Sequence, residues 1–111
     1  MSVLQVGGQW DIVQDNGFRV TVNLTQSGST VGGSAHTSTN DSVGLRGSVT
    51  ATDLDMHIDW KGGARGHYTG TLSHGPFTPP PIGFLKGSTV DDNDRTSHTT
   101  WQSEGKNFQA G

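Results

Sequence analysis

The 111-residue chain contains no cysteine. A disulfide, a thiolate nucleophile and a zinc site with cysteine ligands are therefore excluded. Stability has to come from side-chain packing and from hydrogen bonds between backbone groups. Because small secreted domains often depend on disulfides, the lack of cysteine favours a reducing compartment, and we expect a cytoplasmic protein.

Long apolar runs and clusters of one charge are also missing. No stretch approaches the ~20 apolar residues of a transmembrane helix, so we expect a soluble protein with no membrane partner. Residues 1–10 lack the basic start and the apolar run of a signal peptide. The net charge is −3, and the seven lysines and arginines are scattered along the chain. This scatter argues against a nucleic-acid partner, because a groove that follows phosphates needs clustered positive charge.

Apolar side chains are scarce, at 29% of the chain, and they alternate with polar ones. Residues 18–25 place Phe18, Val20, Val22 and Leu24 on one side, and residues 54–60 repeat the pattern up to Trp60. A period of two residues predicts strands with one dry and one wet side. No segment has a sustained helical period.

Turn signals divide the chain into eight short candidate strands. They cover residues 8–14, 18–25, 30–37, 43–51, 54–60, 65–73, 84–91 and 97–103. The pattern predicts an all-β fold, a small eight-stranded antiparallel up-and-down β-barrel. We expect one domain over residues 1–111, with 1–7 and 109–111 as terminal tails. The proline-rich residues 76–82 are expected to form a loop beside the barrel mouth.

A weak repeat places glycine two residues after a large residue, on the same side of a strand. It occurs at Val31–Ser34, Leu45–Ser48, Tyr68–Thr71 and Leu85–Ser88. Inward glycines let strands coil sharply, as a small barrel requires. They either leave interior space for a ligand or make room for a large side chain, such as Phe18, Trp60 or Trp101.

Short motifs across residues 8–108 are similar to those of one barrel family. They are Gly8-Gln9-Trp10, Asn16-Gly17, Trp60-Lys61, Tyr68-Thr69-Gly70 and Trp101-Gln102-Ser103 followed by Phe108. In these motifs the chain resembles the avidin and streptavidin family, within the calycin group of barrels. The resemblance implies an eight-stranded barrel with a ligand at its open end, and it suggests self-association. We expect a monomer or a homo-oligomer, with a dimer as one possibility.

The resemblance does not extend to biotin. Ala64, Arg65 and Gly66 stand where that family has small hydroxyl residues that hold the biotin rings. The first hairpin offers Asp15-Asn16-Gly17, without the expected pairing of asparagine and serine. A different ligand is therefore expected.

Aromatic residues near the strand ends are the candidate ligand-binding set. We predict a pocket lined by Trp60, Tyr68, Trp101 and Phe84, because pockets are found at barrel mouths. Trp60, Tyr68 and Trp101 fit a filled core equally well. Trp10 and Phe18 are expected in the core.

Three functions are compatible with this barrel. The favoured one is binding of a small hydrophobic or aromatic molecule. The alternatives are a carbohydrate-binding lectin, and a cofactor-free enzyme such as a cyclase or isomerase that acts by positioning its substrate. No cofactor is predicted, and the expected partner is a small molecule or a saccharide.

Two histidines and their acidic neighbours are a candidate metal group. His57, Asp59 and His67 are expected on the outside of adjacent strands, with Asp55 nearby. Histidine with carboxylate is the donor set of many zinc sites. Because no further ligand is evident, a solvated polar surface explains these residues better, and no metal site is predicted.

Overall fold

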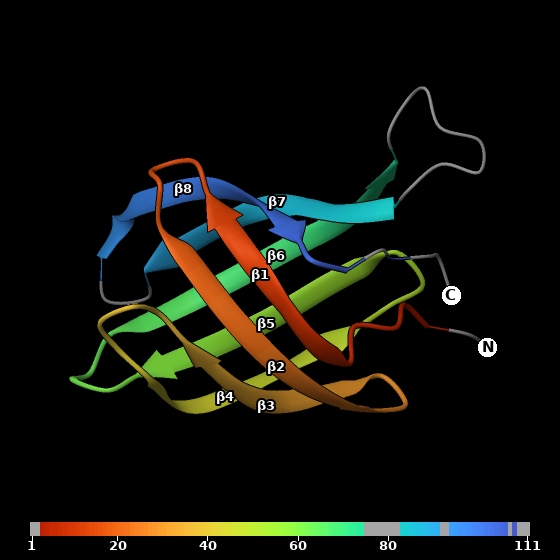
Figure 1. The fold of residues 1–111 in the computed structure, drawn as a ribbon, viewed down its shortest axis with the longest axis horizontal. Coiled ribbons are helices and arrows are strands. Elements are labelled where there is room, and N and C mark those ends of the chain that lie inside the picture. Colours follow the sequence, from red (N-terminus) through yellow and green to blue (C-terminus); the bar gives the residue numbers. More distant parts are fainter. Residues whose placement is uncertain (1–2, 75–82, 92–93, 107, 109–111) are drawn as a thin grey trace.

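The computed structural model describes residues 3–74, 83–91, 94–106 and 108. Figure 1 shows eight strands that form one closed barrel. The strands are β1 (Gly8–Gln14), β2 (Arg19–Ser27), β3 (Thr30–His36), β4 (Ser42–Val49), β5 (Asp53–Trp60), β6 (Arg65–His74), β7 (Gly83–Asp91) and β8 (Asp94–Glu104). Each strand pairs antiparallel with the next, and β1 pairs with β8. The predicted fold class is confirmed, and every predicted strand is present with ends shifted by at most three residues.

The predicted alternation sets the side of each strand that faces the interior. In β5 the buried side chains are those of Leu54, Met56, Ile58 and Trp60, and in β2 they include Val20 and Val22. The expectation that Phe18 belongs to the core is wrong. Phe18 precedes β2, in the turn from β1, and is 45% exposed because it lies at the rim of the barrel.

Aromatic side chains make the centre of the barrel solid. Trp10 contacts Trp101 at a ring-centroid distance of 6.4 Å and Phe108 at 5.1 Å. Both indole N–H groups are satisfied, by the carbonyl oxygens of Val6 and Ser88 respectively, each at 3.0 Å. The ring of Trp101 lies over Gly70, since a methyl group added to that glycine would come within 2.7 Å of the indole. This repeat glycine therefore makes room for a side chain and not for a ligand.

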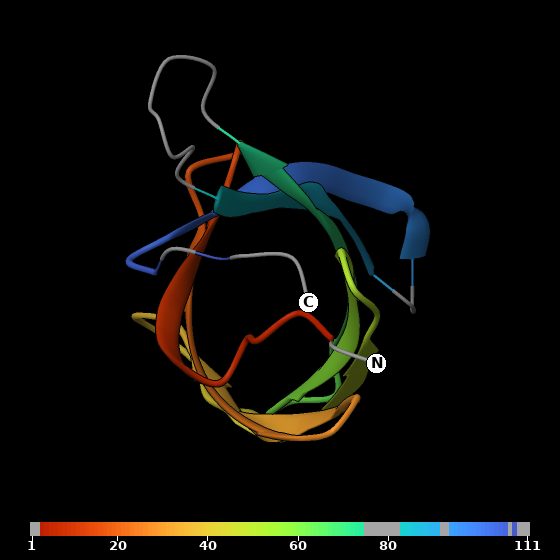
Figure 2. The same cartoon turned by 90° about the vertical axis from the view of Figure 1, so that its right-hand side faces the viewer.

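The segment before β1 closes one end of the barrel and is not a tail. Leu4 and Val6 are fully buried. The side-chain amide of Gln26 donates to the carbonyl of Leu4 at 2.9 Å and accepts from the N–H of Val6 at 2.8 Å. Figure 2 shows this segment lying across the barrel opening. The expected tail at 109–111 lies outside the described residues.

The two ends of the barrel therefore differ. We call the end that holds Leu4, Val6 and Phe108 the plugged end, and the opposite end, with the β1–β2 and β5–β6 turns, the mouth. β6 ends and β7 begins at the plugged end, at the right of Figure 1. The proline-rich residues 76–82 between them lie outside the described residues. Among the described residues we find no helix with the length and hydropathy needed to cross a bilayer.

Candidate functional site

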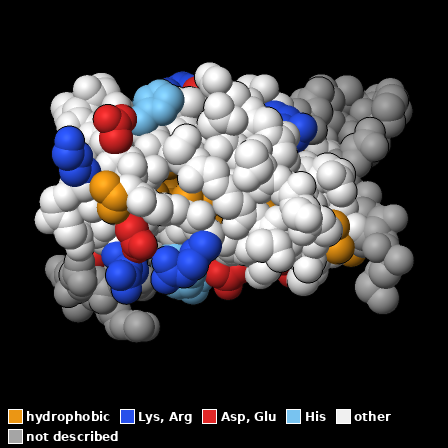
Figure 3. All heavy atoms as spheres, turned by 90° about the horizontal axis from the view of Figure 1, so that it is seen from below, with side chains coloured by type: hydrophobic (Ala, Val, Ile, Leu, Met, Phe, Trp, Pro, Cys, Tyr) orange, Lys and Arg blue, Asp and Glu red, His pale blue; other side chains and the backbone are white. Residues whose placement is uncertain are grey.

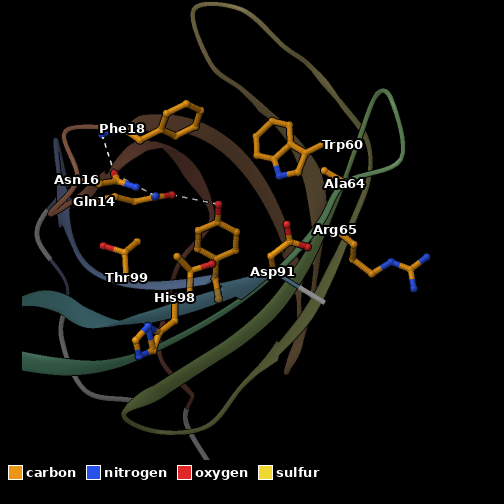
Figure 4. A pocket seen from close by; sticks show the side chains of 12 residues that line it. Gln14, Asn16, Phe18, Trp60, Ala64, Arg65, Asp91, His98 and Thr99 are labelled. Carbon is orange, nitrogen blue, oxygen red and sulfur yellow. Dashed lines mark hydrogen bonds between the residues drawn. The ribbon is translucent and has the colours of Figure 1, made fainter. Parts of the chain in front are cut away.

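A cavity of about 290 Å³ opens at the mouth of the barrel. We call it the mouth pocket (Figure 4). Its lining residues come from the strand ends and turns at this end of the barrel. They are Gln14, Asn16, Phe18, Trp60, Ala64, Arg65, Gly66, Tyr68, Thr89, Asp91, His98 and Thr99.

Two aromatic rings stand at the entrance of the mouth pocket. Figure 4 shows Phe18 and Trp60 on opposite sides of the opening. Phe18 is held by a turn in which the Asn16 side-chain oxygen accepts its backbone N–H at 3.0 Å. Trp60 ends β5, where its N–H donates to the carbonyl of Ala64 at 2.8 Å across a tight turn. The backbone of both residues is therefore positioned by turns that the local sequence specifies.

A chain of polar groups forms the floor of the pocket. The Tyr68 hydroxyl donates to the Gln14 side-chain oxygen at 3.3 Å, and the Gln14 amide donates to Asn16 at 3.4 Å. Gly66 is required beside this tyrosine, because a methyl group added there would lie 2.8 Å from the phenol ring. The floor thus combines a preset ring with amide groups that a ligand can engage.

Burial changes the acidity of this phenol. The pKa of Tyr68 is raised above its usual value of 10.0, mainly by loss of solvent and further by the negative charge of Asp91, while a hydrogen bond with Thr89 opposes the rise. At neutral pH the phenol is protonated and serves as a hydrogen-bond donor. It is not a base, since the phenolate forms only in strong alkali.

Tyr68 is the only tyrosine of the chain, so its titration can be followed by ultraviolet absorbance. We expect tyrosinate to appear at higher pH in the native protein than in the urea-unfolded protein. A folded pKa above the unfolded one means that the associated stability is complete below about pH 10 and is lost as pH rises through the folded pKa. The Tyr68→Phe variant should lack this loss. Equal midpoints in native and unfolded protein would contradict a buried phenol.

The charged rim residues point in different directions. Figure 4 shows the Asp91 carboxylate turned toward the pocket and Arg65 extended away from it. Outside the barrel, Arg65 donates to Asp59 at 2.7 Å and Arg46 donates to the same carboxylate at 3.2 Å. The hydrogen bond from Arg65 is the main cause that lowers the pKa of Asp59. The pocket itself therefore presents a carboxylate more directly than a cation.

The structure brings together two of the four aromatic residues predicted to bind a ligand. Trp60 and Tyr68 line the mouth pocket. Trp101 lies below it in the core, with its ring centroid 6.5 Å from that of Tyr68. Phe84 is near the start of β7, at the plugged end, where it lines a separate depression with Lys106. Phe84 precedes the buried Leu85 and therefore faces the outside of the barrel, so both its side of β7 and its distance along the barrel axis separate it from the others.

Sequence reasoning missed the polar members of the pocket. Gln14 and Thr89 are each only 8% exposed, and both occupy inward positions. Gln14 follows Trp10 and Ile12 at intervals of two, and Thr89 and Asp91 follow Leu85 in the same way. The signal that could have found these residues is a polar side chain at a position where the two-residue period calls for an apolar one.

Comparisons of the chain with family models, with curated proteins and with solved structures find no significant match. The structure is compatible with a calycin-like barrel. The likeness to avidins therefore depends on the short sequence motifs and on the barrel.

One group among the described residues has the donors for a metal ion, and it lies outside the mouth pocket. It consists of Asp55, His57 and His67 on the outer surface of β5 and β6. Asp59, which the sequence grouped with the histidines, binds the two arginines instead.

Proposed function

We propose that the protein binds a small molecule in the mouth pocket, with an aromatic or apolar ring between Phe18 and Trp60. The floor groups Gln14, Tyr68 and Thr89 would engage polar substituents of that ring. Apolar contact would supply most of the affinity, and the few polar groups would fix the orientation of the ligand.

The observation that carries this proposal is the contrast between the two ends of the barrel. The plugged end and the centre are filled by apolar side chains. At the mouth, Gln14 and Thr89 are buried below an open cavity that two aromatic rings flank. Buried polar groups next to an open apolar entrance are typical of ligand sites.

The size of the pocket limits the ligand. Its volume of about 290 Å³ lies at the lower end of the ~300–1,000 Å³ usual for small-molecule sites. We therefore expect a compact ligand of one or two rings. A long lipid chain does not fit, because Tyr68 and Trp101 block the barrel axis below the pocket.

Trp60→Ala tests the proposal. A panel of one- and two-ring compounds is first screened by thermal shift, and the dissociation constant of the best compound is measured by calorimetry. Loss of one aromatic wall should remove about 1.5–3 kcal/mol, which weakens binding about 10- to 150-fold.

Val43→Ala is the matched control, because Val43 is an apolar side chain 70% exposed outside the pocket. This variant should bind as the parent does. Equal affinity for the parent and for Trp60→Ala would contradict the proposal, as would a panel without a single ligand.

A sugar ring is the second candidate occupant. The exposed ring of Phe18 and the amides of Gln14 and Asn16 offer the stacking surface and the hydrogen bonds that saccharides use. A glycan array separates the two candidates. Binding to glycans that Phe18→Ala abolishes, with no response to apolar ring compounds, would favour the lectin. The cofactor-free enzyme stays a prediction.

A further inference from the structure

We propose that the outer surface of β5 and β6 binds a divalent first-row transition-metal ion, with Asp55, His57 and His67 as its protein ligands. We call these three residues the outer histidine site. It shares no residue with the mouth pocket.

The pairing of β5 with β6 creates this group. His57 lies directly opposite His67 in the register of the two strands. Their rings are stacked, with centroids 4.1 Å apart and planes 13° from parallel. Asp55 lies two residues before His57 and therefore on the same side of β5. Its carboxylate oxygen is 2.8 Å from Nε2 of His67.

The spacing of the donor atoms is close to what a metal ion needs. One ligand atom from each residue lies within 4.8 Å of the other two. Bonds of about 2.0–2.1 Å to a tetrahedral ion place ligand atoms roughly 3.3 Å apart. Because the side chain of Asp55 is 55% exposed and that of His67 34% exposed, small side-chain rotations can bring the ligand atoms to the spacing that the ion requires. Water would complete the coordination.

The donor set indicates the class of ion. Imidazole nitrogens suit zinc, nickel and copper, whereas calcium and magnesium prefer sites made only of oxygen. Two imidazoles and one carboxylate carry one negative charge, which reduces the double positive charge of the ion. Affinity should follow the usual order for these ions, with Cu²⁺ above Ni²⁺.

The two arginines nearest this group are engaged by another carboxylate. Arg46 lies opposite His57 on β4, and its guanidinium is held by Asp59. Arg65 is held by the same carboxylate. Thr69 and Val90, opposite Asp55 and His67, add no charge. Seen from below, most of the visible charged and histidine side chains gather toward one end of the barrel (Figure 3).

The test is calorimetric titration of the whole chain with zinc chloride. We expect binding of one ion per chain. Loss of even an outer-shell partner usually weakens metal affinity about 10- to 100-fold, so His57→Asn or His67→Asn, which remove a ligand, should each weaken it at least about tenfold. Asp55→Asn should weaken it less, because the amide oxygen can still coordinate.

The matched control is His36→Asn, which removes an exposed histidine of β3 that is outside the site. It should bind zinc as the parent does. Electron paramagnetic resonance with Cu²⁺ gives an independent measurement, in which the parent should show two nitrogen ligands and each of the two histidine variants fewer. Zinc binding that survives in both histidine variants, or that His36→Asn reduces equally, would overturn the proposal.

Discussion

Trp101→Ala is expected to lower the free energy of unfolding by about 3–5 kcal/mol, the usual cost of truncating a large buried aromatic residue. The side chain is buried at the centre of the barrel, between Trp10 and Tyr68. Its removal loses the transfer free energy of the indole and leaves a cavity that a closed ring of strands cannot easily collapse. Since small domains have only about 5–15 kcal/mol in total, the loss would be a large share of the stability.

Denaturant unfolding followed by circular dichroism measures this loss. Trp60→Ala is the matched control, because it removes the same side chain at the mouth, where solvent can fill the space. We expect the control to lose less stability than Trp101→Ala while it loses more ligand affinity. A destabilisation in Trp101→Ala no larger than in the control would contradict a solid barrel centre.

Gly87→Ala is expected to cost about 3 kcal/mol, at the upper end of overpacking effects. Gly87 lies in β7, directly opposite Gly70 of β6 and Trp101 of β8. A methyl group added at this position would overlap the backbone carbonyl of Thr69 and would lie 2.7 Å from the Cα atom of Gly70. The obstacle is backbone paired on both sides, so no side-chain rotation can relieve it.

Gly32→Ala is the corresponding control in β3. A methyl group there would meet its nearest atoms at 3.7 and 3.8 Å, which is ordinary contact. We expect little change in stability, or a gain of about 0.4–1 kcal/mol from reduced freedom of the unfolded chain. Equal denaturation midpoints for the two alanine variants would show that β7 can shift, and would contradict the tight approach of β6 and β7.

The fold was predictable because its signals are local. The alternation through Val20 and Val22, and through Leu54 and Ile58, sets which sides of β2 and β5 face inward, and turn residues mark the strand ends. Local pattern cannot show where a segment outside the strands packs. The burial of Leu4 and Val6 depends on Gln26, about twenty residues away in the sequence.

The site was less predictable because it depends on depth along the barrel. Trp60, Trp101 and Phe84 look alike in sequence, as aromatic residues in β5, β8 and β7. The register of the strands places Trp60 at the mouth and Trp101 in the centre, whereas Phe84, next to the buried Leu85, faces outward near the plugged end. The two-residue period assigns Phe18 to the core together with Val20 and Val22. Phe18 nevertheless lies outside the strand, because β2 begins only at Arg19. The pairing of strands that are distant in the sequence fixes these depths, and a short stretch of sequence does not contain that information.

The position of Leu4 and Phe108 has a practical consequence. Both lie near the ends of the described chain, and both pack at the plugged end. A fluorophore, a bead or a fused protein attached just before Leu4 or just after Phe108 would therefore lie at the end away from the mouth pocket. A barrel immobilised in this way would present the mouth pocket to the solution, which is the orientation that a binding assay on a surface needs.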